Sequence, residues 1–124
     1  MVSYEEAGEM MDEIVEEIPE VYYKYLNGGI VLLENAKLHP KNKHNDLYIL
    51  GEYQNSYQLG RSIRIFYGSL AIVHGYLPRD QFREKFRDVV LHELTHHLES
   101  LSGERDLEIE DAIKIEKYKR GEKI

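Results

Sequence analysis

The stretch RDQFREKFRDVVLHELTHHLESLS, residues 79–102, carries the longest helical pattern in the chain. Apolar side chains recur along it at steps of three and four, which is the spacing of one face of an α-helix. This face holds Phe82, Phe86, Val90, Leu94, Leu98 and Leu101. Val89, His92 and His96 lie on another side. A helix with apolar residues around so much of its circumference is predicted to be central and buried, and Gly103 is a natural end for it.

A second helix is predicted near the N-terminus, over residues 3–18. Ser3 followed by Glu6 is a capping-box pattern, and Pro19 follows the end of the helix. The first 20 residues contain eight acidic and no basic side chains. We interpret this charge as a solvated outer face of the helix.

Between the two helices, three segments rich in β-branched and aromatic residues predict strands. They are residues 30–38, 47–53 and 61–68. Ser69 is a possible cap for a short helix that ends at Pro78, Gly51 is a possible β-bulge, and residues 104–119 predict a last helix with mixed charges. The order of helix, strands, helix and helix predicts one α+β domain over residues 1–124.

Composition narrows the possible functions. The chain has no cysteine, so disulfides and thiolate metal sites are excluded, and His, Asp or Glu must hold any metal ion. No cluster of Lys and Arg predicts nucleic-acid binding. No apolar segment approaches the ~18 residues of a membrane span, and no basic stretch followed by an apolar run predicts a signal peptide. The expected location is therefore the cytoplasm, with no membrane partner.

His92, Glu93 and His96 form an HExxH motif inside the long helix. Residues four apart on a helix share a face, so both imidazoles can reach one zinc ion at about 2.0–2.1 Å. Glu93 is rotated away from that ion but can hold a water molecule beside it. Zinc lowers the pKa of such a water towards about 7, and a carboxylate can accept its proton and return it to a leaving amine. The motif therefore predicts metal-assisted hydrolysis, with Glu93 as the general base.

The alternative is that these residues belong to an ordinary helix. HExxH arises by chance in roughly a few sequences per hundred of this composition. Here the motif falls in a helix predicted to be buried, where an uncompensated His or Glu would cost about 1–3 kcal/mol. A metal ion would compensate that cost, so we favour the metal site over core histidines.

A catalytic zinc ion of this kind needs a third protein ligand. In the metzincin pattern a glycine follows the second histidine by three residues, and the third ligand comes three residues later. Glu99 and Ser102 occupy those positions here and do not fit, but a shift of four residues, about one helical turn, gives Gly103 and Asp106. Asp106 is therefore the expected ligand. The competing carboxylates are Glu99, Glu104, Glu108, Glu110 and Asp111.

The stretch LHELTHHLESLSGERD, residues 91–106, resembles the small bacterial zincin-like metallopeptidases, also called minimal zincins. Their motif is HExxH followed by another histidine, a glycine turn and an aspartate. His92, Glu93, His96, His97, Gly103 and Asp106 match these types, with a longer spacer before the glycine. The resemblance covers about residues 20–112. It implies a zincin-like α+β fold, with a small mixed sheet packed against the HExxH helix, and peptidase activity without an assigned substrate.

The leading hypothesis is a zinc-dependent peptidase in which His92, His96 and Asp106 bind the metal and a peptide or protein is the substrate. The alternative is a non-catalytic zinc-binding module with a closed coordination sphere. His97 is expected to have a structural role. A tyrosine on a strand (Tyr48, Tyr53 or Tyr67) is a possible donor to an oxyanion, and residues 47–53 or 61–68 could form the edge strand that pairs with substrate.

Overall fold

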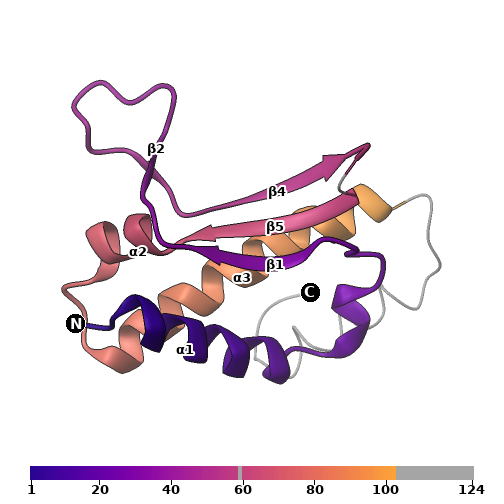
Figure 1. Ribbon diagram of the computed structural model, residues 1–124, viewed down its shortest axis with the longest axis horizontal. Helices are drawn as coiled ribbons and strands as arrows, with labels where there is room; N and C mark the ends of the chain where they lie inside the picture. The colour runs from indigo at the N-terminus through magenta and orange to yellow at the C-terminus, as the bar shows by residue number, and fades with distance from the viewer. Residues whose placement is uncertain (59, 103–124) are drawn as a thin grey trace.

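The computed structural model describes residues 1–58 and 60–102 (Figure 1). Its helices are α1 (Tyr4–Glu17), the 3-10 helix η1 (Glu20–Tyr23), α2 (Tyr67–His74) and α3 (Arg79–Leu101). Its strands are β1 (Gly29–Leu33), β2 (Lys37–Leu38), β3 (Tyr48–Ile49), β4 (Gly51–Ser56) and β5 (Gly60–Phe66). The helices expected over residues 3–18 and 79–102 are confirmed, whereas the helix expected over residues 104–119 lies outside the described residues.

The main sheet has three strands in the order β1-β5-β4. Strand β1 runs parallel to β5, with Ile30 opposite Ile63, and β4 runs antiparallel to β5, with Tyr53 opposite Ile63. Strands β2 and β3 form a separate two-stranded antiparallel sheet. The main sheet is therefore mixed, and the α+β class expected from the sequence is confirmed.

The hydrophobic core lies between one face of the main sheet and the helices α1 and α3 (Figure 1). The predicted apolar face of α3 is buried, from Phe82 to Leu101. Ala7, Met10 and Ile14 face the core from α1, and Ile63 and Ile65 face it from β5. On the opposite face of the sheet, Val31 is 44% exposed. Among the described residues, no helix has both the length and the apolar character that crossing a membrane requires.

Two of the three predicted strands are interrupted. The segment 30–38 leaves the main sheet after Leu33, because the carbonyl of Asn35 accepts a hydrogen bond from the N–H of Gly68 at the start of α2. The segment 47–53 is interrupted at Leu50, where the chain passes from pairing with β2 to pairing with β5. Both breaks mark a change of partner, which the residue types alone do not encode.

The predicted cap of the short helix is wrong. Helix α2 begins at Tyr67, directly after β5, and no side chain caps it. Ser69 lies inside the helix and is fully buried, and its Oγ accepts a hydrogen bond of 2.9 Å from the N–H of Lys37. Glycine is required at position 68, because a Cβ there would lie 2.5 Å from the backbone nitrogen of Ala36. Ser69 therefore links α2 to β2 instead of capping α2.

The chain between β2 and β3 forms an arm that stands out from the body of the protein (Figure 1). At its base the N–H of His39 donates to the carbonyl of Leu47 at 2.8 Å, which extends the pairing of β2 with β3. The carbonyl of His39 then accepts from the N–H of Asn42 at 3.0 Å and closes a turn. The arm is thus fixed at His39 by hydrogen bonds on both sides of the residue.

The capping box of α1 gives the first prediction. Ser3 Oγ accepts from the N–H of Glu6 at 3.1 Å, and the Glu6 carboxylate accepts from the N–H of Ser3 at 3.0 Å. Ser3→Ala removes the first bond and should lower the free energy of unfolding by about 1 kcal/mol in urea titrations. Ser3→Asp keeps an acceptor and is the matched control. Equal losses in the two variants would contradict a capping role for the side chain.

Candidate functional site

Two histidine rings converge on the exposed side of α3. Both His92 and His96 are exposed, and their Nε2 atoms lie 3.1 Å apart with the rings edge to face. Two ligands at about 2.0–2.1 Å from one tetrahedral ion lie about 3.3 Å apart. The spacing of the two nitrogens therefore fits a shared zinc ion, and the rings already point at a common position.

The burial argument drawn from the sequence is wrong for these two side chains. Helix α3 buries one face against the core, but His92 and His96 lie on the other side and keep contact with solvent. Only Glu93, at 6% exposure, and His97, fully buried, are interior polar residues of the motif region. The histidine pair therefore carries no burial cost that a metal ion must compensate, and its case depends on the convergence of the rings.

Glu93 lies directly beneath strand β4. A Cβ added at Gly51 would lie 3.0 Å from Val89 Cγ1, 3.1 Å from Ile65 Cδ1 and 3.2 Å from Glu93 Cγ. Gly51 thus permits a close approach of β4 to α3, at the site where the sequence suggested a bulge. Burial raises the pKa of the Glu93 carboxyl, although the neighbouring His92 and His96 act in the opposite direction. The carboxyl is held next to the imidazole pair in a partly desolvated position.

Two hollows meet over the motif. The larger, of about 720 Å³, is lined by His39, Ile49, Gly51, Glu52, Tyr53, His92, Glu93, His96, Glu99 and Ser100. The smaller, of about 540 Å³, is lined by His39, Tyr48, Ile49, Leu50, Gly51, His74, Lys85, Asp88, Val89, His92 and Glu93. Their shared residues are His39, Ile49, Gly51, His92 and Glu93. The motif therefore lies at the junction of one groove, whose walls come from α3, β4 and the arm.

Among the described residues, no third candidate ligand joins the histidine pair. Glu99 approaches His96, but its carboxylate lies 3.8 Å from Nδ1, whereas Nε2 faces His92. The Glu99 side chain is 68% exposed. Its carboxylate is placed to orient the His96 ring, and not to bind an ion between the two Nε2 atoms. Within residues 1–58 and 60–102, no three metal-binding side chains gather at one point. The other competitors, Asp106, Glu104, Glu108, Glu110 and Asp111, lie outside the described residues.

His97 belongs to a buried hydrogen-bond chain that joins α3 to β4 and η1. Its Nε2 contacts the carbonyl of Lys24 at 2.8 Å, and its Nδ1 contacts the hydroxyl of Tyr53 at 2.9 Å. Because a carbonyl only accepts, Nε2 carries the hydrogen. Burial lowers the pKa of the imidazole and keeps it neutral, so Nδ1 accepts from the hydroxyl of Tyr53. Arg61 Nη1 in turn donates to the Tyr53 oxygen at 3.0 Å and to Ser100 Oγ.

This chain of bonds determines the roles of several predicted residues. His97 has the structural position expected from the sequence. Tyr53 lines the larger hollow, but its hydroxyl hydrogen is directed to His97. Tyr67 lies in α2 instead of a strand, and its hydroxyl donates to the carbonyl of Val2. Arg61 and Ser100 were not predicted, since only the packing of α3 against β5 brings them together.

The structure also distinguishes the two candidate edge strands. Residues 61–68 contribute β5, which is the central strand and pairs on both sides. Residues 47–53 contribute the start of β4, which pairs with β5 alone among the described strands. Strand β4 also passes over Glu93, so it is the strand with a free edge next to the histidine pair.

Comparison with known proteins gives a match among the solved structures. No family model matches the chain, and no curated protein matches it. A solved structure, described as a conserved hypothetical protein from Thermus thermophilus, is 33% identical and superimposes with a TM-score of 0.70. The match covers 83% of this chain and 100% of that chain. The fold is thus shared with a protein whose description names no activity.

The buried chain of bonds gives the second prediction. Tyr53→Phe removes the donor to the buried Nδ1 of His97 and should lower the free energy of unfolding by about 1–3 kcal/mol. Tyr57→Phe, at a fully exposed tyrosine, is the control and should change stability by less than about 0.5 kcal/mol. Chemical denaturation of both variants is the measurement. An unchanged stability for Tyr53→Phe would show that the bond does not contribute.

Proposed function

The chain belongs to the same family as the conserved hypothetical protein from Thermus thermophilus, and from its site we propose a zinc-dependent metallopeptidase with a zincin-like arrangement. One observation carries the proposal. The Nε2 atoms of His92 and His96 converge to 3.1 Å at the junction of two hollows, with the Glu93 carboxyl beside them. This combination is the one that metal-assisted hydrolysis requires.

His92 and His96 would hold the zinc ion through Nε2, and Asp106 is the proposed third ligand. Bound there, zinc would supply a Lewis acid that polarises a substrate carbonyl and acidifies a water molecule. The groove leaves the histidine pair open to solvent, as a hydrolytic site needs. A structural zinc site is closed by four protein ligands, so the open groove favours catalysis over the alternative of a structural module.

Glu93 would act as the general base and then as the general acid. Its carboxylate accepts the proton of the attacking water as the carbon–oxygen bond forms. The same proton then passes to the amine nitrogen as the carbon–nitrogen bond breaks, which restores the carboxylate. Burial beneath β4 raises the pKa of the Glu93 carboxyl and thereby strengthens it as a proton acceptor.

The proposed substrate is an extended peptide. The free edge of β4 offers backbone N–H and C=O groups to such a chain, as sheet edges do in strand-addition complexes. The hollows of about 720 and 540 Å³ on either side of the motif fall in the usual range for ligand sites. They would receive side chains from the two sides of the cleaved bond.

Substitution of the general base gives the third prediction. Glu93→Gln should bind one zinc ion per chain, as the wild type does, and lose hydrolysis by at least about 10²-fold, because the amide cannot accept the proton. Zinc content is measured by atomic absorption, and hydrolysis with a library of quenched fluorescent peptides. Glu84→Gln, at an exposed position of the same helix, is the control and should keep full activity.

Other results would favour the non-catalytic module. If removal of zinc unfolds the protein and Glu93→Gln changes nothing measurable, the metal is structural. If zinc is absent from the wild-type protein both when it is purified without added metal and after reconstitution with zinc, both forms of the proposal fail.

The fourth prediction concerns the ligand set. Asp106→Asn should weaken zinc binding by about 10-fold or more, because a carboxylate is replaced by a neutral amide. Glu99→Gln should reduce zinc affinity less, since its carboxylate lies at Nδ1 of His96 and not at the Nε2 pair. Competition titrations with a chromophoric chelator measure both affinities. A larger loss for Glu99→Gln than for Asp106→Asn would assign the third ligand to Glu99.

A further inference from the structure

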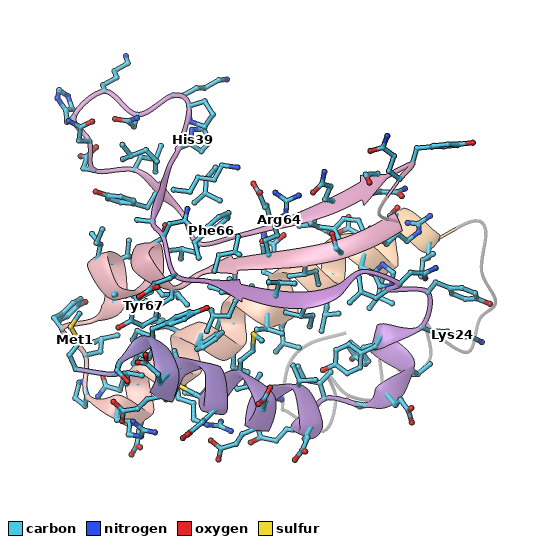
Figure 2. All side chains as sticks on the ribbon, viewed as in Figure 1. Met1, Lys24, His39, Arg64, Phe66 and Tyr67 are labelled. Atoms are coloured by element: carbon cyan, nitrogen blue, oxygen red, sulfur yellow. The ribbon has the colours of Figure 1, made fainter. Side chains whose placement is uncertain are left out.

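His39 lies on the arm, directly after β2 (Figure 2). It borders both hollows. It is the one residue of the arm that does so within the described parts of the chain. The other residues common to the two hollows are Ile49 and Gly51, from β3 and β4, and the motif residues His92 and Glu93. His39 is therefore the residue of the arm that shares the lining of both hollows with His92 and Glu93.

Hydrogen bonds fix both the place and the tautomer of this ring. The backbone of His39 is bonded to Leu47 on one side and to Asn42 on the other. The N–H of Lys41 donates to His39 Nδ1 at 3.0 Å. A nitrogen that accepts a hydrogen bond carries no hydrogen, so in this arrangement the hydrogen of the ring lies on Nε2. The arm thus presents an N–H donor from the far side of the ring.

Two other polar groups near the junction serve other purposes. The hydroxyl of Tyr53 is directed to His97, and Glu93 is the proposed base. Among the described residues, His39 forms no group of three metal-binding side chains with His92 and His96. Its Nε2 has no hydrogen-bond partner within the described residues. His39 therefore brings a ring N–H to the lining that the two hollows share.

We propose that His39 is a further catalytic residue, whose Nε2–H donates a hydrogen bond to the carbonyl oxygen of the cleaved amide. The bond strengthens as negative charge develops on that oxygen, and no proton is transferred. An imidazole N–H held in advance suits this role, because its dipole needs no rearrangement when the charge appears. The proposal rests on the proposed peptidase function. It assigns a task to the arm, whose residues are not part of the hydrophobic core.

The test compares four variants as zinc-loaded, full-length protein, with the quenched fluorescent peptide that the wild type cleaves fastest. His39→Ala should lower kcat about 10²-fold and leave KM within about twofold, because the bond strengthens only in the transition state. His39→Gln retains a donor of similar reach and should recover most of kcat. His44→Ala, in the exposed part of the arm, and Tyr57→Phe, at a fully exposed tyrosine that lines neither hollow, should match the wild type.

A second readout does not depend on turnover. Long-range proton–nitrogen NMR spectra of histidine-labelled, metal-free protein should show His39 with hydrogen on Nε2 and a bare, hydrogen-bonded Nδ1. Hydrogen on Nδ1, or a wild-type kcat in His39→Ala, would overturn the assignment while the peptidase proposal stands. If the zinc-loaded wild type cleaves no peptide, the proposed function fails and this role fails with it. Equal zinc content and circular dichroism in all variants exclude loss through unfolding.

Discussion

The geometry of helix α3 is the constraint on which the site depends. A helix turns about 100° per residue, so consecutive residues of the motif must face different surroundings. Leu94 and Leu98 lie in the core, His92 and His96 lie in solvent, and Glu93 lies at the boundary beneath β4. The same rotation that buries the apolar face therefore presents two imidazoles on one side with a carboxyl next to them.

That helix has a fixed position relative to the sheet because polar bonds supplement the apolar packing. The hydrogen-bond chain from Arg61 through Tyr53 and His97 to the carbonyl of Lys24 connects β5, β4, α3 and the end of η1. The direction of each bond follows because the carbonyl only accepts, the guanidinium only donates and burial keeps the His97 ring neutral. Hydrogen bonds are directional, whereas apolar contacts permit sliding. The chain therefore holds β4, and the groove edge with it, in one register above the motif.

The sequence predicts the parts of this structure that are local. The capping box at Ser3 and Glu6 and the apolar spacing from Phe82 to Leu101 each involve residues within a few positions of one another, and both helices are confirmed. The strand breaks after Leu33 and at Leu50 were missed, because each depends on which strand lies alongside. Helix α2 was placed too late for a similar reason, since Ser69 bonds with the distant Lys37.

The candidate site also has a local part that the sequence predicts and a part that depends on segments distant in the sequence. The ring pair of His92 and His96 follows from four-residue spacing, whereas Gly51, Tyr53 and His39 reach the groove only through sheet pairing and the path of the arm.

A chain of this length has one core and little room for a deep cleft between domains. The structure instead forms its groove at a sheet edge, where β4 crosses α3 and the arm adds a further wall. Such a groove needs no second domain, because a single helix provides its floor. The short length of the chain is therefore no argument against an open site. The groove wall that the arm provides contains no residue of the hydrophobic core, so its sequence can change without loss of core packing.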